Sequence, residues 1–196
     1  MMESYTGVYR RNSIIVPAQR ESNALYQNGY GSMLQEEGVL TLTPCEALFL
    51  VEGKKLSVIS EETREQLSFN ELLMRLTSLD RLMWTKYLVF RDIRSKGYVV
   101  KPGYELGVDF LVYERGDFGK KPPKYLIFAV WEGEPKRMSE VMYILKQTQE
   151  KEKILKLAVI DRRGELVHYT LQRLHLKEGK EVGEREEPTS SHEEEP

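Results

Sequence analysis

The sequence contains one cysteine and only three histidines among its 196 residues. Cys45 cannot form an internal disulfide bond, and three scattered histidines do not complete a structural zinc cluster with it. No run approaches the roughly 18 consecutive apolar residues that a membrane span needs, and the first residues lack the basic and apolar regions of a signal peptide. We therefore expect a cytoplasmic protein of a reducing compartment, with no membrane segment, no metal and no cofactor.

Acidic residues concentrate at the C-terminal end. Residues 177–196 contain eight acidic and three basic side chains, so this segment carries −5 and the rest of the chain about +3. A mildly basic body permits contact with nucleic acid but does not indicate it, because most lysines and arginines simply face solvent. The acidic segment has almost no apolar residue, and we expect it to be disordered.

Strand and helix signals in the first part of the chain predict an α+β unit. Alternating apolar residues predict strands within residues 7–17, 39–42 and 56–59. Capping boxes, in which an N-cap hydroxyl is followed three residues later by glutamate, predict two helix starts, at Thr43 with Glu46 and at Ser68 with Glu71. Further helices are expected at residues 18–27 and 79–95.

The second part is richer in strands. They are expected over residues 98–101, 108–114, 125–132, 155–160 and 166–174, with one helix near residues 138–145. Several strands around one helix predict a mixed sheet and an α/β fold. The chain should then divide into an α+β domain (1–85), a mixed-sheet α/β domain (86–176) and a tail (177–196).

Two kinds of nuclease site can be compared with these residues. A magnesium-dependent nuclease needs an aspartate and a Glu-x-Lys motif on adjacent strands, and Asp109 with residues 134–136 has the required letters. The motif falls in a turn after a strand, so an ordinary surface turn is favoured. A metal-free ribonuclease instead needs a base for the ribose 2′-hydroxyl, an acid for the leaving 5′-oxygen and a cation.

Four segments carry a family likeness: YQNGYG (26–31), EALFLVE (46–52), the run from FRDIRSKGYVVKPG through GVDFLVYERG (90–116), and LAVID with the following Gly164 (157–164). In these segments the chain resembles the archaeal tRNA-splicing endonuclease family, and the resemblance extends over about residues 7–174. The resemblance implies an α+β N-terminal domain and a restriction-endonuclease-like mixed sheet in the C-terminal domain, in agreement with the expected α/β division.

The family's catalytic groups are a tyrosine, a histidine and a lysine. The resemblance places the tyrosine at Tyr113, in the motif V-Y-x-R-G, which begins a glycine-containing surface loop of residues 113–125. It places the lysine at Lys153, just before the L-x-L-A-V strand. Lys151 and Lys156 are close enough to remain alternatives.

Pro122 occupies the position of the family's histidine, three residues before Tyr125. Proline has no titratable group, and Lys120 and Lys121 hold their protons too tightly to act as general acids near neutrality. Losing a general acid typically costs about 10²- to 10⁴-fold in rate. We therefore expect Tyr113, Pro122 and Lys153 to be vestigial, with no competent catalytic residue in the chain.

The sequence thus resembles the structural subunit of heterotetrameric, (αβ)₂ splicing endonucleases. This resemblance implies a catalytic subunit as partner and a precursor tRNA with a bulge-helix-bulge motif as substrate. It also implies two interfaces. One is an edge strand that pairs across a dimer, formed by Val167, His168, Tyr169, Thr170, Leu171 and Gln172. The other is an acidic loop that docks on the opposite dimer, formed by Asp161, Arg162, Arg163, Gly164 and Glu165.

Three functions remain open from the sequence. The first is the structural subunit. The second is a self-sufficient endonuclease that uses Tyr113 and Lys153 without the histidine. The third is a free-standing RNA-binding or scaffold protein that has kept the fold.

Overall fold

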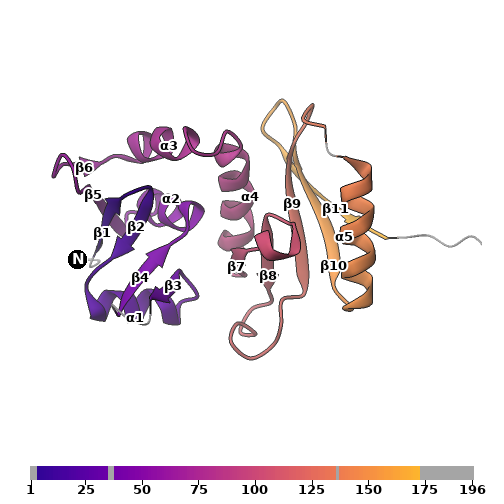
Figure 1. The fold of residues 1–196 in the computed structure, drawn as a ribbon, viewed down its shortest axis with the longest axis horizontal. Helices are drawn as coiled ribbons and strands as arrows, with labels where there is room; N and C mark the ends of the chain where they lie inside the picture. Colours follow the sequence, from indigo (N-terminus) through magenta and orange to yellow (C-terminus); the bar gives the residue numbers. More distant parts are fainter. Residues whose placement is uncertain (1–3, 35–37, 136, 173–196) are drawn as a thin grey trace, which may run out of the picture.

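The computed structural model describes residues 4–34, 38–135 and 137–172. Two units, each built on its own sheet, lie side by side along the long axis, and helix α4 (Met83–Ser95) stands between them (Figure 1). The expected α/β architecture, with an α+β N-terminal domain and a mixed-sheet C-terminal domain, is confirmed. In the described residues no helix combines the length and apolar character of a membrane span. The expected tail lies outside them.

The N-terminal domain is a six-stranded sheet with three helices. The strand order is β3-β4-β2-β1-β5-β6. The elements are β1 (Tyr5–Arg10), β2 (Ser13–Val16), α1 (Gln19–Gln27), β3 (Ser32–Leu34), β4 (Val39–Leu42), α2 (Pro44–Glu52), β5 (Leu56–Ser60), β6 (Gln66–Leu67) and α3 (Phe69–Thr77). The first two strands, expected within residues 7–17, form an antiparallel hairpin, and β1 also pairs in parallel with β5.

Both capping boxes predicted from the sequence are present. The Thr43 hydroxyl accepts from the Glu46 backbone N–H, and the Glu46 carboxylate accepts in return from Thr43. The same reciprocal pair joins Ser68 and Glu71 at the start of α3. Each box satisfies N–H groups that the first helical turn leaves without partners, which fixes where the helix begins.

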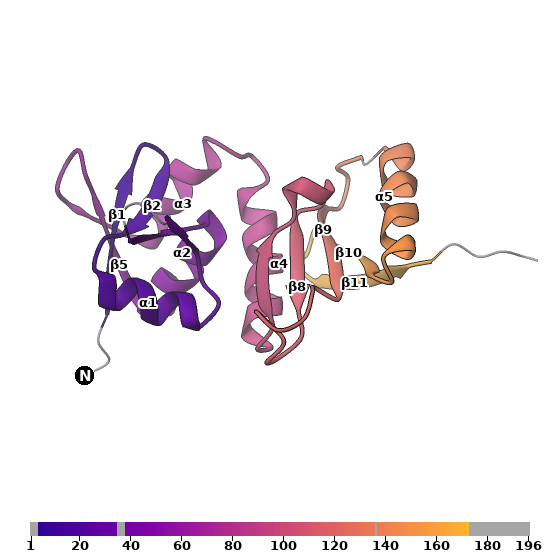
Figure 2. The ribbon, with the colours of Figure 1, turned by 60° about the horizontal axis from the view of Figure 1, so that its bottom comes forward.

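The C-terminal domain is a five-stranded sheet between two helices. The strand order is β11-β10-β9-β8-β7, with β9 and β10 parallel and the other pairs antiparallel. Figures 1 and 2 show α4 and α5 on opposite faces of this sheet. The elements are β7 (Val99–Pro102), the 3₁₀ helix η1 (Tyr104–Leu106), β8 (Phe110–Tyr113), β9 (Tyr125–Trp131), α5 (Met138–Glu150), β10 (Ile154–Ile160) and β11 (Leu166–Leu171).

One hydrophobic core runs through α4 and joins the two sheets. It contains Tyr87 and Phe90 of α4 and extends to Ala158 on the facing side of β10. Leu126 and Leu155 belong to a second cluster, on the side of α5. Since α4 packs against both domains, its position ties the two sheets together.

The expected start of this helix at residue 79 is wrong. The helix begins at Met83, because residues 79–82 form a turn in which the Asp80 carboxylate accepts a hydrogen bond from the Leu82 N–H at 2.9 Å. The turn closed by Asp80 therefore precedes the helix. The apolar spacing continues without a break through this turn, so spacing alone predicted too early a start.

Candidate functional site

The loop expected from the sequence to begin with the family's tyrosine connects β8 with β9. Tyr113 ends β8, and its ring packs edge-on against Phe118 with the centroids 5.1 Å apart. Burial raises the pKa of the Tyr113 phenol, so that it stays protonated at neutral pH. Pro122 lies exposed in the same loop. No residue in this loop supplies an imidazole to replace the family's histidine.

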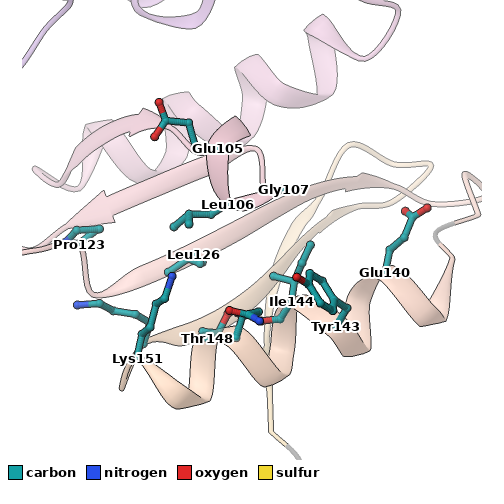
Figure 3. Close-up of a pocket in the computed structure, with 12 residues that line it drawn as sticks. Glu105, Leu106, Gly107, Pro123, Leu126, Glu140, Tyr143, Ile144, Thr148 and Lys151 are labelled. Carbon is teal, nitrogen blue, oxygen red and sulfur yellow. The ribbon is translucent and has the colours of Figure 1, made fainter.

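A cavity of about 540 Å³ lies beside this loop, between β9, η1 and α5 (Figure 3). Its apolar floor includes Leu126 and Ile144, and Lys151 and Glu140 stand at opposite ends. The complete lining is Glu105, Leu106, Gly107, Pro123, Leu126, Glu140, Tyr143, Ile144, Gln147, Thr148, Lys151 and Lys153. All of these residues are described, and none is a histidine.

The three candidate lysines lie in two different pockets. Lys151 and Lys153 line the cavity, and neither forms an ion pair with a carboxylate in the described part of the chain. Lys156 lies in β10 and lines a different pocket, next to α4. Tyr113 does not line the cavity. Lys151 and Lys153 therefore share one cavity, and Lys156 lies apart from them.

Asp109, the aspartate of the magnesium-nuclease alternative, is part of a structural network. Its carboxylate lies 3.3 Å from the Lys86 ammonium and accepts a hydrogen bond from the Ala129 N–H at 2.9 Å. Glu134 forms an ion pair with Arg81 instead, and Lys136 lies outside the described residues. Among the residues described, no group of three or more His, Cys, Asp or Glu side chains is arranged for a metal. The carboxylates are thus used in different contacts, and the magnesium alternative is not supported.

Asp109→Asn is expected to lower the free energy of unfolding by about 1–3 kcal/mol, because a mostly buried charge-assisted contact with Lys86 is lost. Urea unfolding followed by circular dichroism measures this change. Glu134→Gln is the matched control, since its partner Arg81 is largely exposed and such ion pairs contribute little. Equal destabilisation by both substitutions would contradict a structural role specific to Asp109.

The proposed docking loop is a tight turn between β10 and β11. The Asp161 carboxylate accepts hydrogen bonds from the backbone N–H groups of Arg163 and Glu165, both at 2.8 Å. Gly164 has a φ of +82°, a value that favours glycine. The side chains of Arg162, Arg163 and Glu165 are exposed. Asp161 therefore holds the turn, and the other charges are presented to solvent.

The expected interface strand forms one edge of the C-terminal sheet. β11 pairs with β10, and its other edge has no partner strand in the described chain. Val167 and Tyr169 are 44% and 53% exposed, which leaves an apolar strip on this edge. The strand ends at Leu171, so Gln172 follows it and residues 173–174 of the expected strand lie outside the described part. An unpaired edge of this kind can accept another strand.

Two clusters were not anticipated from the sequence. Glu46 and Lys101 form a buried ion pair that joins α2 to β7, and Asp92, His168 and Lys156 line a pocket beside α4. The sequence did contain an indication of the second cluster. Lys156 is the one ionisable side chain in the apolar strand β10.

Two family models match the chain in succession. The tRNA intron endonuclease N-terminal domain matches residues 5–73, and the tRNA intron endonuclease catalytic C-terminal domain matches residues 83–169. Each match covers one of the two sheets described above.

Archaeal relatives give the same assignment. The tRNA-splicing endonuclease of Methanococcus vannielii is 33% identical over 152 residues, which cover 78% of this chain and 84% of the relative. That of Thermococcus kodakarensis is 29% identical over 154 residues, covering 79% and 89%. That of Methanococcoides burtonii is 30% identical over 175 residues, covering 89% of this chain and 47% of the relative. Sequence, domain order and fold agree, and the chain belongs to the tRNA-splicing endonuclease family.

Proposed function

We propose that this chain is the structural subunit of a cytoplasmic tRNA-splicing endonuclease and that it assembles with a catalytic paralogue as an (αβ)₂ heterotetramer. The observation that carries the proposal is Pro122. The resemblance places it where the family has a histidine, and the cavity beside its loop has two lysines but no imidazole among its lining residues. A metal-free ribonuclease without this proton donor lacks one of its three chemical groups.

The partner then supplies the chemistry. A base in the partner removes the proton of the ribose 2′-hydroxyl, and the 2′-oxygen bonds to the adjacent phosphorus. The 5′-oxygen leaves with a proton from the partner's acid, and a lysine stabilises the charge on the phosphoryl oxygens. The products are a 2′,3′-cyclic phosphate and a 5′-hydroxyl. The role of this chain is to position the partner on a bulge-helix-bulge precursor tRNA.

Two surfaces support assembly. The apolar strip of β11, with Val167 and Tyr169, fits pairing with a partner strand across a dimer. The loop of residues 161–165 presents Glu165 at the surface for docking on the opposite dimer. A subunit with no chemistry of its own can still be required, because a misplacement of about 1 Å can cost roughly 10²-fold in rate.

Mixing experiments test the proposal. The purified chain alone is expected to leave a bulge-helix-bulge precursor tRNA uncut, whereas the chain mixed with a histidine-bearing paralogue is expected to cleave it in the presence of EDTA. The control is the paralogue alone at the same concentration. Cleavage by this chain alone would overturn the proposal.

A second function, self-sufficient cleavage, is supported by the cavity itself. Lys153 lines it together with Pro123 of the loop, so a substrate phosphate could still meet a cation there. This alternative predicts that Lys153→Gln abolishes cleavage by the isolated chain. The third function, a free-standing RNA-binding or scaffold protein, predicts that no histidine-bearing paralogue co-purifies with this chain.

A further inference from the structure

A second pocket, of about 180 Å³, lies on the opposite face of the C-terminal sheet from the cavity of Figure 3. It is placed where the C-terminal end of α4 meets β8, β9, β10 and β11. Its floor is apolar and its rim is charged. The lining is Asp92, Ile93, Lys96, Tyr98, Val112, Tyr125, Ile127, Lys156 and His168. We call it the tyrosine pocket.

Lys156 is the cation that this pocket leaves without a counter-charge. Strand alternation places it on the α4 side of β10, the side of the buried Ala158 and Ile160. Its ammonium donates to the Thr170 hydroxyl at 3.1 Å and lies 5.4 Å from the Tyr125 ring centroid. No carboxylate in the described part of the chain forms an ion pair with it. An ammonium at the rim of the pocket without a carboxylate partner can bind an anionic ligand.

The other charged groups of the rim neutralise one another. One oxygen of the Asp92 carboxylate lies 2.8 Å from the Lys96 ammonium and 3.0 Å from the His168 Nε2. Burial opposes the ionised carboxylate, but these two contacts lower the pKa of Asp92, so that it remains charged at neutral pH. The Asp92 carboxylate therefore contacts Lys96 and His168 and not Lys156, so the Lys156 ammonium is available to a ligand.

Two tyrosine rings form the walls. Tyr98 and Tyr125 meet edge to face with centroids 6.5 Å apart. Arg115 lies 5.8 Å from the Tyr98 centroid and is fixed by a 2.8 Å hydrogen bond to the Lys96 carbonyl. Aromatic walls over an apolar floor suit a flat, unsaturated ring, and a neighbouring cation suits a phosphate attached to it.

We propose that the tyrosine pocket binds one unpaired nucleotide of an RNA strand, with the base against the rings of Tyr98 and Tyr125 that line the pocket and the phosphate at Lys156. The volume is below the roughly 300–1,000 Å³ of sites for drug-sized ligands, so the pocket accepts one base and not a stacked pair. A duplex is excluded because its bases are stacked and paired. The choice of RNA as the source of the nucleotide rests on the proposed function. The proposal that the pocket binds a nucleotide rests on the structure alone.

The test measures binding of a fluorescently labelled single-stranded RNA hexamer to the full chain without any partner subunit, across a series of salt concentrations. Lys156→Gln is expected to weaken binding and to reduce the slope of log K against log salt by about 0.7, the value for one phosphate contact on a single strand. Tyr98→Leu is expected to weaken binding roughly 5- to 150-fold, as loss of one stacked base does, while leaving the salt slope unchanged.

Controls separate the site from general charge. Lys55→Gln removes an exposed lysine of the N-terminal domain and is expected to leave the slope unchanged. Urea midpoints equal to that of the unsubstituted chain show that each variant is folded. A nucleoside monophosphate is then tested as a competitor of the labelled hexamer. If it competes only at concentrations at least tenfold above those of unlabelled hexamer, the pocket binds a nucleotide of a strand. If the two compete equally well, the pocket binds a free nucleotide.

Equal salt slopes for Lys156→Gln and Lys55→Gln, or equal affinity for the hexamer and its duplex, would overturn the proposal. These outcomes are independent of the mixing experiment. If the chain binds the hexamer at this pocket but does not support cleavage by a paralogue, the proposal for the tyrosine pocket stands and the structural-subunit proposal fails. If the chain supports cleavage by a paralogue but does not bind the hexamer at this pocket, the structural-subunit proposal stands and the pocket proposal fails.

Discussion

Glu46→Gln is expected to lower the free energy of unfolding by about 3–5 kcal/mol, the cost of removing one member of a buried ion pair. Glu46 is fully buried, and its carboxylate lies 3.2 Å from the Lys101 ammonium. The substitution preserves shape but leaves the lysine charge buried without compensation. The affected contact joins the two domains, because Glu46 belongs to α2 and Lys101 to β7.

The carboxylate of Glu46 makes two further hydrogen bonds. It accepts hydrogen bonds from the backbone N–H of Gly31 at 3.0 Å and from that of Thr43 at 2.9 Å. The Lys101 ammonium in turn donates to the Gly31 carbonyl at 2.8 Å. Gly31 has a φ of +63°, and a Cβ there would lie 2.6 Å from the Leu40 side chain. The carboxylate and the lysine thus hold a turn that only glycine fits.

The pair is costly to break although it contributes little as a pair. Burial lowers the pKa of Lys101, even though Glu46 opposes the shift. A lowered folded-state pKa means that the charged lysine is less favoured in the folded chain than in the unfolded one, so desolvation is not fully offset. Glu46→Gln with Lys101→Met should therefore be less destabilised than the two single substitutions together predict.

Urea unfolding of the single and double variants measures both effects. Glu71→Gln is the matched control, since Glu71 occupies the same capping-box position in α3 but is exposed and accepts its hydrogen bonds from Ser68. A small change for Glu71→Gln beside a large one for Glu46→Gln assigns the difference to burial and the lysine. Similar changes in both variants would show that helix capping accounts for the whole effect.

Local signals in the sequence were sufficient for most of the fold. The hairpin of β1 and β2, both capping boxes and the strands of the C-terminal sheet depend on residues within a few positions of each other. β3 and β6 were missed because strands of three and two residues carry no detectable alternation. Their pairing is decided by neighbouring strands.

The candidate site depended on contacts between distant residues, and this limited its prediction. Glu46 was identified as a helix cap, but its second partner lies 55 residues away in β7. Asp109 matched a nuclease motif by letters, whereas its partners Lys86 and Ala129 come from α4 and β9. The candidate lysines could be separated only by the structure, in which Lys151 and Lys153 line one pocket and Lys156 lines another. Spacing along the chain does not contain that information.

Removing both acidic charges from the loop of residues 161–165 is expected to dissociate the proposed heterotetramer into αβ dimers and to lower cleavage by about 10²-fold, the effect of misplacing reacting groups. The test uses Asp161→Asn together with Glu165→Gln. Asparagine retains an oxygen that can accept from the Arg163 and Glu165 N–H groups, so the turn is kept while two negative charges are removed. Light scattering after size-exclusion chromatography measures the assembly, and cleavage of precursor tRNA measures the activity.

Two further variants separate charge from loop shape. Asp161→Ala removes the hydrogen-bond acceptor as well as the charge, so the turn itself is disturbed. Arg162→Gln with Arg163→Gln removes two exposed positive charges and keeps both acids, and it is expected to leave the tetramer intact. If Asp161→Ala dissociates the complex but Asp161→Asn with Glu165→Gln does not, the shape of the turn is what docks. An intact and active complex in all three variants would remove this loop from the interface and leave the β11 edge as the remaining assembly surface.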